Sequence, residues 1–516
     1  MSNEIRHPGH GHGHGNHFAN LKYGYIIVGI SVAYMLYISV ARYLYLRKWT
    51  KQGKTPTGAI KAAAFGSLWV HVLVWTFLLL LLSFINIANL KTSWIIVIKR
   101  LGRVGYCLVP LDAVLALRPA FLGPHASYLE HLGLHKWLSR VILAATTAHG
   151  IGYYVKWLME SRFWNRSMAW RNFLGVVPFW MSILLLAVSL RPVRRKIYAF
   201  FYIWHNVTVF AFTAFMLWHA RPGVTDVLVF SFCLYGLQVF LRIKYTHRLE
   251  KLTIVDPEES QLRLVKLQKP ATYPVDWIPG SHLRMSWRLT SWRYWVWPTH
   301  PYSICSLPGD QTVDLVIKKG FRFEMFSSLE YSISTPYCSV PPPFYQTAEN
   351  VHVICGGSGI SLGVPIYRYL KQNSSVTSKM TWCVRNSNDV FVLPELSVSS
   401  PVDVYLTKSE NTLFVNNNTE EDHGLLNENG KDMELESLDN DSGEQSPLAS
   451  DDKAPQKAVN FQKGRPIFDE IFNHFAETEE PGNKWIVVCG PTPLIESVKK
   501  WGKLNNVQVF EELYDM

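Results

Sequence analysis

The chain has 516 residues and a formal net charge of +11, and 48% of its residues are hydrophobic. That hydrophobic share, which includes 19 Trp, is high for a soluble protein and predicts a membrane half diluted by a soluble half. The positive charge does not predict a nucleic-acid partner, because the basic residues gather at the ends of apolar segments, where membrane proteins keep them.

The first 20 residues form a His/Gly-rich tail with the run HPGHGHGHGNH. Glycine between histidines makes a flexible tail that can chelate Cu²⁺, Ni²⁺ or Zn²⁺. The alternative is an unstructured extension with no role, and the sequence leaves both interpretations open.

Seven apolar segments follow, and each approaches the roughly 20 residues that a membrane-spanning helix needs. They are residues 23–41, 65–88, 94–117, 135–156, 173–190, 198–219 and 224–242. Lys and Arg clusters follow the first, fifth and seventh segments, so the positive-inside rule places these ends in the cytosol and the N-terminus outside or in a lumen. The sequon at Asn165 then lies on a lumenal loop, where a glycan would confirm the topology.

The fourth and sixth segments each carry two histidines 14 residues apart, His135 and His149 in one and His205 and His219 in the other. Fourteen residues make about 3.9 helical turns and rise ~21 Å, so both histidines share one side of the helix and lie near opposite faces of the membrane. Two such helices side by side offer two stacked histidine pairs, each suited to hold one b-type haem through both axial positions. We expect His135 and His205 at the inner, cytosolic haem and His149 and His219 at the outer one.

Two further polar residues, His71 and Arg140, lie in the apolar segments and have predicted roles. His71 is predicted to form a hydrogen bond between helices, which is a frequent role of a lone transmembrane histidine. Arg140, one turn beyond His135, either neutralises a haem propionate or extends to the membrane interface.

After residue 248 the sequence takes on the period-two alternation of half-buried strands, which predicts an antiparallel β-barrel over residues 249–345. Strands then alternate with helices, which predicts a parallel α/β domain over residues 346–516. Residues 408–463, rich in acidic side chains, are predicted to be a disordered insertion in that domain. The seven scattered cysteines form no zinc spacing and favour reduced thiols in a cytosolic soluble half.

Two stretches of the barrel region are candidates for holding a flavin ring and its phosphates. The stretch HPYSICS ends a strand-rich region, and the stretch IKKGF contains a basic glycine turn suited to a pyrophosphate. The candidate residues are His300, Pro301, Tyr302, Ser303, Lys319 and Gly320.

The α/β region carries two candidate nucleotide-binding turns. In GGSGIS, glycines let the backbone approach a phosphate, and the N-terminus of the following helix favours its charge. Arg385 can pair with a ribose 2′-phosphate, which favours NADPH over NADH, or it is a surface arginine. In CGP, at the end of the last predicted parallel strand, Cys489 lies near the nicotinamide or is a buried structural cysteine. The candidate residues are Gly356, Gly357, Ser358, Gly359, Ile360, Ser361, Arg385, Cys489, Gly490 and Pro491.

Together these residues resemble the ferric reductase/NADPH oxidase superfamily over nearly the whole chain after residue 60. The histidine pairs, with the H-x-W-x-x-R run of His135, Trp137 and Arg140, are similar to its haem helices. HPYSICS resembles its flavin motif, GGSGIS its nucleotide turn, WCVR its NADPH-phosphate segment and CGP its C-terminal signature. The length, short N-terminal region and acidic insertion look closest to a yeast subgroup, the "altered inheritance of mitochondria" probable metalloreductases. Relatives often end in an aromatic residue that stacks on the flavin, whereas here Tyr514 stands two residues before the end.

The resemblance implies a multi-pass α-helical membrane bundle of about seven helices over residues 21–248. A cytosolic ferredoxin-NADP reductase-like module follows, with an FAD-binding barrel and an NADPH-binding α/β domain. The implied cofactors are FAD and two haem b, with NADPH as co-substrate. FAD takes a hydride from NADPH and passes single electrons through the inner and outer haems to an acceptor across the membrane. The flavin is needed because a hydride carries two electrons while haem and Fe³⁺ each take one, and two haems divide the ~30 Å of lipid.

Two enzymes would share these cofactors and differ only in the final acceptor. One is a metalloreductase acting on ferric chelates or cupric ions in iron and copper homeostasis, and the other is a superoxide-generating NADPH oxidase acting on O₂. We expect the metalloreductase, which the His-rich tail on the far side favours. A third interpretation is a cytochrome-like membrane protein without catalytic output, and the flavin and nucleotide motifs argue against it. The sequence does not distinguish the plasma membrane from the endoplasmic reticulum. It also does not decide whether the protein forms a homo-oligomer.

Overall fold

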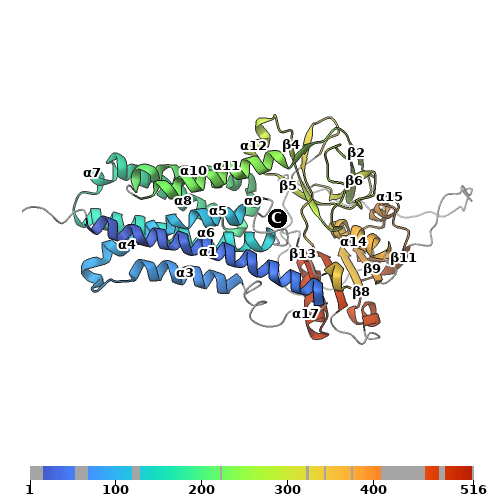
Figure 1. Cartoon of the computed structure of the whole chain (residues 1–516). Coiled ribbons are helices and arrows are strands. Elements are labelled where there is room, and N and C mark those ends of the chain that lie inside the picture. Colours follow the sequence, from blue (N-terminus) through green and yellow to red (C-terminus); the bar gives the residue numbers. More distant parts are fainter. Residues whose placement is uncertain are drawn as a thin grey trace, which may run out of the picture.

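The computed structural model describes most of the chain, and Figure 1 shows a helical half joined to a half that contains the strands. The described residues are 15–52, 68–118, 128–220, 223–320, 325–341, 344–372, 376–407, 459–475 and 483–513. The first 14 residues of the His/Gly-rich tail, residues 408–458 of the acidic segment and Tyr514 therefore lie outside the described residues.

The helices of the first half lie side by side along one axis (Figure 1). They are α1 (Gly15–Gln52), α3 (Leu68–Phe84), α4 (Leu90–Cys107), α5 (Val109–Ala116), α6 (Tyr128–Met159), α7 (Phe163–Ser167), α8 (Trp170–Val188), α9 (Arg191–Lys196), α10 (Tyr198–His219) and α11 (Thr225–Lys244). Among the described helices, four are long and apolar enough to cross a membrane, namely α1 over Leu21–Val40, α8, α10 and α11, and α3 is apolar but shorter. The predicted membrane bundle is confirmed, and within the described residues each of the seven apolar segments is mainly helical.

The third predicted segment, residues 94–117, is two helices rather than one. Leu108 separates α4 from α5, and Pro110 stands in the first turn of α5. Proline has no N–H with which to continue the hydrogen bonds of α4, and its fixed φ suits the first turn of a new helix. Hydropathy alone cannot reveal this break, because the apolar pattern runs through it.

Polar side chains inside the bundle have partners on neighbouring helices. His71 Nδ1 lies 3.1 Å from the hydroxyl of Tyr34 in α1, so the predicted hydrogen bond between helices is present. The buried guanidinium of Arg100 donates to the carbonyl of Ile85 at 2.6 Å and lies 4.3 Å from the ring centre of Tyr23. These contacts reduce the cost of keeping ionisable groups at membrane depth.

The soluble half begins with two antiparallel sheets that enclose one core. Their strands are β1 (Thr246–Arg248), β7 (Tyr331–Ser334), β4 (His282–Trp287) and β5 (His300–Ser303) in one sheet, and β2 (Leu252–Val255), β3 (Leu262–Gln268) and β6 (Thr312–Lys318) in the other. This arrangement agrees with the predicted antiparallel barrel. The barrel starts at β1, slightly before the predicted boundary at residue 249, because the chain leaves α11 and pairs with β7 almost at once.

The last part of the chain forms a six-stranded parallel sheet in the order β11-β10-β9-β8-β12-β13. The strands are β8 (Asn350–Gly356), β9 (Thr377–Val384), β10 (Val402–Leu406), β11 (Val459–Lys463), β12 (Lys484–Gly490) and β13 (Gln508–Leu513), with the main helices α14 (Ile360–Gln372) and α17 (Thr492–Leu504). Two predictions need correction. Residues 459–463 pair with β10 and so belong to the sheet instead of the insertion, and β12 is not the last parallel strand because β13 follows it.

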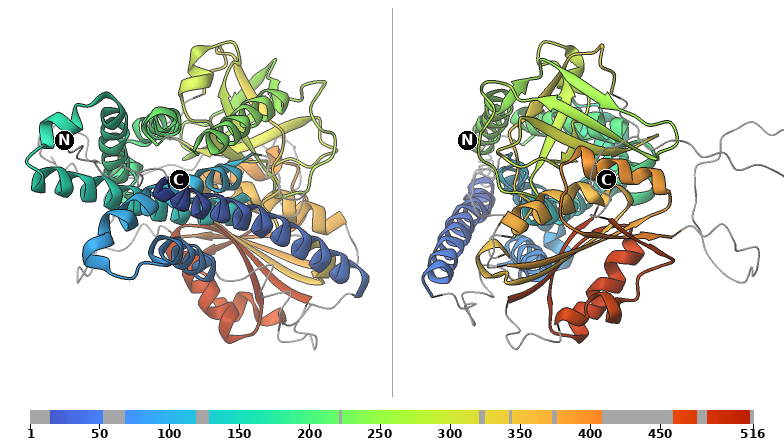
Figure 2. Two further views of the ribbon diagram at one scale, coloured as in Figure 1. Left: turned by 60° about the vertical axis from the view of Figure 1, so that its left-hand side comes forward. Right: turned by 90° about the vertical axis from the view of Figure 1, so that its right-hand side faces the viewer.

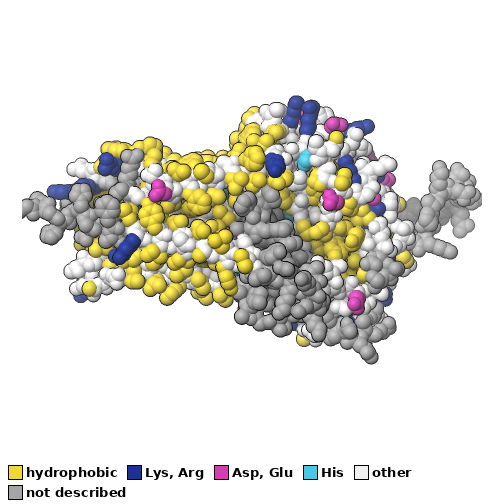
Figure 3. Space-filling view, in the orientation of Figure 1, with side chains coloured by type: hydrophobic (Ala, Val, Ile, Leu, Met, Phe, Trp, Pro, Cys, Tyr) yellow, Lys and Arg dark blue, Asp and Glu magenta, His cyan; other side chains and the backbone are white. Residues whose placement is uncertain are grey.

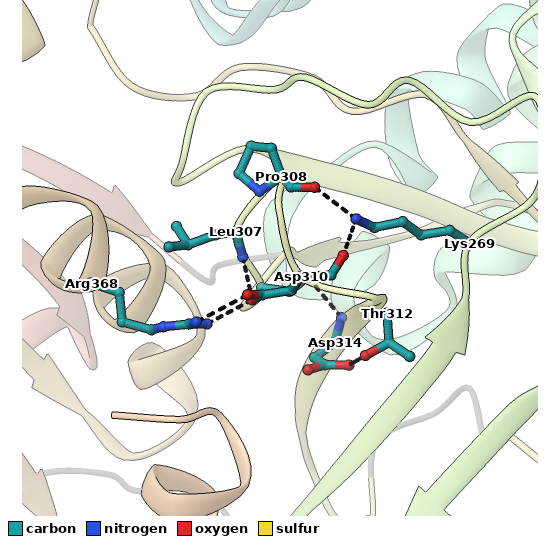
Figure 4. Close-up of polar contacts among 8 residues, drawn as sticks. Lys269, Leu307, Pro308, Asp310, Thr312, Asp314 and Arg368 are labelled. Atoms are coloured by element: carbon teal, nitrogen blue, oxygen red, sulfur yellow. Dashed lines mark hydrogen bonds and ion pairs between the residues drawn. The ribbon is translucent and has the colours of Figure 1, made fainter. Parts of the chain in front are cut away.

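The barrel lies next to the α/β domain (Figure 2), and polar contacts join the two (Figure 4). The carboxylate of Asp310, in the turn before β6, receives two hydrogen bonds from the Arg368 guanidinium of α14, at 2.7 and 3.0 Å. The buried carboxylate of Asp389 accepts from the hydroxyl of Ser260 at 2.7 Å. Apolar residues of β3 and β6 also belong to the same core as α14. These contacts hold the end of β5 and the glycine-rich turn in one fixed arrangement.

Candidate functional site

Two pairs of histidine rings lie between α6 and α10. The ring centroids of His135 and His205 are 6.2 Å apart, and those of His149 and His219 are also 6.2 Å apart. α6 packs against α4, and α10 packs against α8, whereas the two histidine-bearing helices approach each other less closely. All four predicted residues are therefore brought together, in the predicted combinations.

The spacing of each pair fits one iron between two imidazoles. With metal–nitrogen bonds of about 2 Å, rings on opposite sides of one metal have centroids roughly 6 Å apart. The ring planes of the two pairs cross at 80° and 89°. Both pairs thus have the donor type and the separation that bis-histidine haem ligation requires.

Backbone carbonyls hold the two histidines that lie farther from the soluble half. His149 Nδ1 lies 2.8 Å from the carbonyl oxygen of Ile98 in α4, and His219 Nδ1 lies 2.9 Å from that of Arg171 in α8. A carbonyl can only accept, so each Nδ1 carries the proton and each Nε2 keeps its lone pair. This tautomer is the one that a metal-binding Nε2 needs.

A glycine follows each of these carbonyls by one helical turn and makes room for the ring. A Cβ on Gly102 would lie 2.6 Å from His149 Nδ1, and a Cβ on Gly175 would lie 2.3 Å from the Cε1 of His219. Side-chain carbons do not approach other atoms this closely, so any larger residue would displace the histidine. The two glycines were not singled out from the sequence, because glycine in an apolar helix carries no signal of what lies opposite.

His135 is held differently, by Asp112 of α5. His135 Nδ1 lies 3.1 Å from the Asp112 carbonyl oxygen and 3.0 Å from its carboxylate Oδ1. The hydroxyl of Ser139 donates to Oδ2 of the same carboxylate at 2.6 Å. Asp112 was also missed, although an acidic residue in an apolar segment is a signal of function. Arg140 rests against Trp137, 4.4 Å from its ring centre, and its two predicted roles remain predictions.

The four flavin candidates of HPYSICS form strand β5. Tyr302 and Ser303 are buried, and the Tyr302 hydroxyl has no hydrogen-bond partner among the described residues. A buried hydroxyl without a partner is costly and fits a site where a ligand supplies the missing bond. Burial, aided by the nearby charge of Arg284, lowers the pKa of His300 to about 4, so its ring is neutral at pH 7. Pro301 lies between these residues and pairs with β4.

The second flavin candidate is a turn after β6. Gly320 has a φ of +75°, which glycine adopts without strain. The ammonium of Lys319 forms an ion pair with Asp256, at 2.7 Å, and donates to the carbonyl of Pro257. A phosphate would therefore compete with a carboxylate for Lys319, which weakens the prediction that this residue binds a pyrophosphate.

The glycine-rich turn and the CGP turn meet at the carboxyl ends of β8 and β12. A Cβ on Gly359 would lie 2.3 Å from the carbonyl oxygen of Cys489, and one on Gly356 would lie 2.8 Å from Pro491 Cδ. Gly357 has a φ of +53°, and its carbonyl accepts from the Trp382 indole at 2.9 Å. The two turns thus form one surface at the sheet edge where parallel α/β folds bind ligands.

The remaining nucleotide candidates lie around this surface. α14 begins at Ile360, directly after the turn, so its N-terminal N–H groups are close to the turn. Ser361 is buried in the first turn of α14. Arg385 is exposed directly after β9, the neighbour of β8. Cys489 is fully buried, which agrees with the structural alternative for its thiol. Ser358 and Gly490 lie in the two turns themselves.

Glu512 is a titratable residue that the sequence did not single out. It lies beside Cys489 across the β12–β13 pair. Burial raises its pKa to about 7, and a hydrogen bond with Ser339 opposes that rise. Its Oε2 has no hydrogen-bond partner among the described residues. The edge of the sheet next to the CGP turn therefore holds a carboxyl group that is partly protonated at neutral pH.

Comparison with known proteins agrees with this arrangement. A model of the ferric reductase like transmembrane component matches residues 101–216. An FAD-binding domain matches residues 246–352, and a ferric reductase NAD binding domain matches residues 348–502. The chain belongs to the ferric reductase family. It is an oxidoreductase with a transmembrane component and with domains for FAD and a nicotinamide nucleotide.

Relatives within the ferric reductase family extend over the whole chain. The "Probable metalloreductase AIM14" of Clavispora lusitaniae is 44% identical, with 99% of each chain covered. The protein of the same name from Debaryomyces hansenii is 38% identical, covering 99% of this chain and 98% of its own. Among solved structures, a ferredoxin NADP+ reductase from Neisseria gonorrhoeae with bound FAD and NADP is similar over 52% of this chain and 97% of its own, at 11% identity and a TM-score of 0.34.

On the expectation that each histidine pair holds one haem, replacing Gly102 with Val should displace His149 and remove the haem of that pair. The new side chain would occupy the space of the imidazole, so haem bound per protein should fall by about half. Gly236→Val in α11 is the matched control, because nothing lies within 4 Å of a Cβ there. Haem content of the purified protein, measured as the pyridine haemochrome, checks this. Unchanged haem in Gly102→Val would contradict the assignment.

Glu512 should make stability fall as pH rises from 4.5 to about 7. The folded state binds the Glu512 proton more tightly than the unfolded state does, so the folded state loses this advantage as pH rises through the folded pKa. Glu512→Gln should flatten the decline in the thermal unfolding midpoint, followed by tryptophan fluorescence. Glu511→Gln, which removes the partner of Lys499, is the control and should keep the slope. A slope unchanged in Glu512→Gln would show that Glu512 does not titrate in this range.

Proposed function

We propose that this protein is an NADPH-dependent metalloreductase that moves electrons through FAD and two b-type haems to ferric or cupric ions across the membrane. The observation that carries the proposal is the pairing of four histidines, His135 with His205 and His149 with His219, at one common ring separation of 6.2 Å. Two such pairs on the same two helices, ~21 Å apart along the axis, form a relay through the hydrocarbon core.

The four histidines would hold the haems through Nε2, and the contacts at Nδ1 of His135, His149 and His219 fix those rings. When bound, FAD and haem would supply the chemistry that divides the two-electron hydride of NADPH into single electrons. Apolar side chains of the neighbouring helices exclude water from the rings. The chain itself therefore contributes ligands, orientation and a dry environment.

Residues at the sheet edge bind NADPH. The backbone of Gly357 and Gly359 and the N-terminus of α14 receive the phosphates, and the exposed guanidinium of Arg385 pairs with the 2′-phosphate. On the barrel, Tyr302 and Ser303 of β5 bind the flavin. The contact between Asp310 and Arg368 holds these two surfaces in register, so hydride donor and acceptor meet at a fixed separation.

The orientation follows from the charges at the helix ends. The basic helix α9, with Arg191, Arg194, Arg195 and Lys196, lies on the side of the soluble half, and α7 lies at the opposite end (Figure 1). The positive-inside rule then makes the soluble half cytosolic. His149 and His219 lie nearer the α7 end, so the haem that they would hold lies on the side of the acceptor. Relatives that share the whole chain are named probable metalloreductases, which favours metal ions over O₂ as that acceptor.

Membranes that contain the protein, supplied with NADPH first under nitrogen and then under air, test the proposal. We expect ferrous iron from a ferric chelate under nitrogen, with reduction of the haem bands and little superoxide in air. Superoxide in air, together with iron reduction that superoxide dismutase abolishes, would instead establish an oxidase. Haem bands that stay oxidised with NADPH would contradict both activities.

Two variants in the same assay locate the relay. His149→Ala should lose the outer haem and iron reduction while NADPH still reduces the flavin. His71→Ala, which removes a membrane histidine bonded to Tyr34 instead, is the matched membrane control. Gly357→Trp should block the phosphates and stop flavin reduction while the haems remain. Gly309→Trp, at an exposed turn with open space, is its control. Iron reduction that survives His149→Ala unchanged would refute the relay.

A further inference from the structure

A short aromatic helix of the barrel lies where the membrane half meets the soluble half. This helix, α12 (Trp292–Val296), connects β4 to β5 within the run WRLTSWRYWVWP. The side chain of Trp292 is 62% exposed and that of Trp295 is 43% exposed. Trp297, just after the helix, is also exposed. Large aromatic side chains grouped on a surface usually mark a place of contact.

The position of α12 along the membrane axis is set by α11, one of the membrane-spanning helices. Tyr294, only 1% exposed, packs under the guanidinium of Arg242 in the last turn of α11, with 4.2 Å from the Arg242 carbon to the ring centre. The Tyr294 hydroxyl lies 2.8 Å from the Thr246 hydroxyl, and Arg242 donates to the Tyr294 carbonyl. α12 is thus fixed to the point where a membrane helix leaves the bilayer.

The surface around α12 continues that of the membrane half. Figure 3 shows hydrophobic side chains that extend from the helices onto the part of the soluble half where Figure 1 places α12, with Lys and Arg side chains beside them. The Arg293 guanidinium lies 4.9 Å from the ring centre of Trp287 and 5.9 Å from that of Trp292. Indole rings flanked by cations suit the headgroup region of a bilayer, which is partly apolar and often anionic.

We propose that α12 is an interfacial anchor, whose Trp292 and Trp295 side chains insert into the headgroup region of the leaflet on the side of the soluble half. The anchor has a structural consequence for β5, which begins at His300 only four residues after α12 ends. A bilayer that holds α12 also holds the flavin strand at a constant distance from the membrane helices.

The test uses a nitroxide label on the full chain in lipid nanodiscs that contain phosphatidylcholine and phosphatidylserine. Trp292→Cys carries the label at the anchor. Phe461→Cys is the matched control, because Phe461 is 55% exposed and β11 lies at the end of the molecule away from the helices (Figure 1). The unsubstituted chain gives the background of the native cysteines.

Oxygen concentrates in lipid, whereas a nickel chelate stays in water, so the two relaxants distinguish the environments. We expect the label at 292 to relax more with oxygen and the label at 461 more with nickel. Equal exposure of both labels to nickel would overturn the proposal, and so would a label at 292 shielded from both relaxants, which would indicate a protein partner. A second measurement uses lipids that carry a photoreactive group near the headgroup. Crosslinking to the unsubstituted chain should label residues 287–297 and should not label β11.

A separate observation concerns the unequal surroundings of the two histidine pairs, and it rests on the proposed function. His135 Nδ1 lies 3.1 Å from the backbone carbonyl of Asp112 and also 3.0 Å from its carboxylate, whereas Nδ1 of His149 and Nδ1 of His219 each lie against a neutral backbone carbonyl. A carboxylate acceptor draws the Nδ1 proton more strongly and makes Nε2 a stronger donor to a metal. A stronger donor favours the oxidised metal and lowers its reduction potential.

We infer that Asp112 is a positioning residue that gives the haem near the soluble half the lower reduction potential. Electrons arriving from the flavin then run downhill to the pair formed by His149 and His219. Ser139 supports this arrangement, because its hydroxyl holds the Asp112 carboxylate in place at 2.6 Å.

Spectroelectrochemical titration of the haem bands in the purified full chain tests this inference. In Asp112→Asn the lower midpoint should rise by about 59 mV or more, which is a tenfold shift of a one-electron equilibrium, and the upper midpoint should stay in place. Asp112→Glu keeps the charge and should keep the lower midpoint. Asp226→Asn, which removes a carboxylate bonded to Tyr25, should change neither.

The outcomes separate the inference from the proposed function. A chain without haem would refute the proposed function itself. Two haems with a lower midpoint that stays in place in Asp112→Asn, or that rises equally in Asp112→Glu, would overturn only the role of Asp112. If Asp112→Asn loses a haem, Asp112→Glu decides the matter through the lower of its two midpoints. A value that differs from that of the unsubstituted chain decides against the inference, and an unchanged value decides for it.

Discussion

The arrangement of the membrane half depends on one requirement, that an imidazole inside a hydrocarbon core needs a partner at each nitrogen. For three of the four ring histidines Nδ1 finds an oxygen atom in this chain, which leaves Nε2 directed to the space between α6 and α10. Gly102 and Gly175 leave room for the rings, so α4 and α8 can approach closely enough for their carbonyls to reach the histidines. The positions of four helices thus follow from satisfying polar atoms where water is absent.

The soluble half depends on the membrane half for its placement and on its own polar contacts for its internal geometry. The chain passes from α11 into β1 almost without a linker, and Arg242 of α11 packs on Tyr294 of the barrel. Asp310 and Arg368 then tie the barrel to α14. An electron carrier works only if its sites keep constant separations, and the chain achieves this with short connections and half-buried ion pairs. Long flexible linkers would sacrifice that constancy.

Much of the architecture could be predicted because it depends on local patterns. Apolar runs of about 20 residues have one stable structure in lipid, and the 14-residue spacing of His135 and His149 has one geometrical meaning on a helix. The glycine turn between an apolar strand and a helix is equally local. The strand at residues 459–463 and the added strand β13 were not predicted, since each depends on pairing with a distant segment. The break at Leu108 was not predicted because the apolar pattern runs through it.

Residue type and spacing along one helix or one turn are enough to identify the membrane and soluble halves, the four histidines and the two glycine-containing turns. The folded structure was needed to show which oxygen atom faces three of the four histidines, that Lys319 is held by Asp256, and that Glu512 lies beside Cys489. Those facts are contacts between segments far apart in the chain. Their energies depend on distances of a few tenths of an ångström, which no spacing in a sequence encodes.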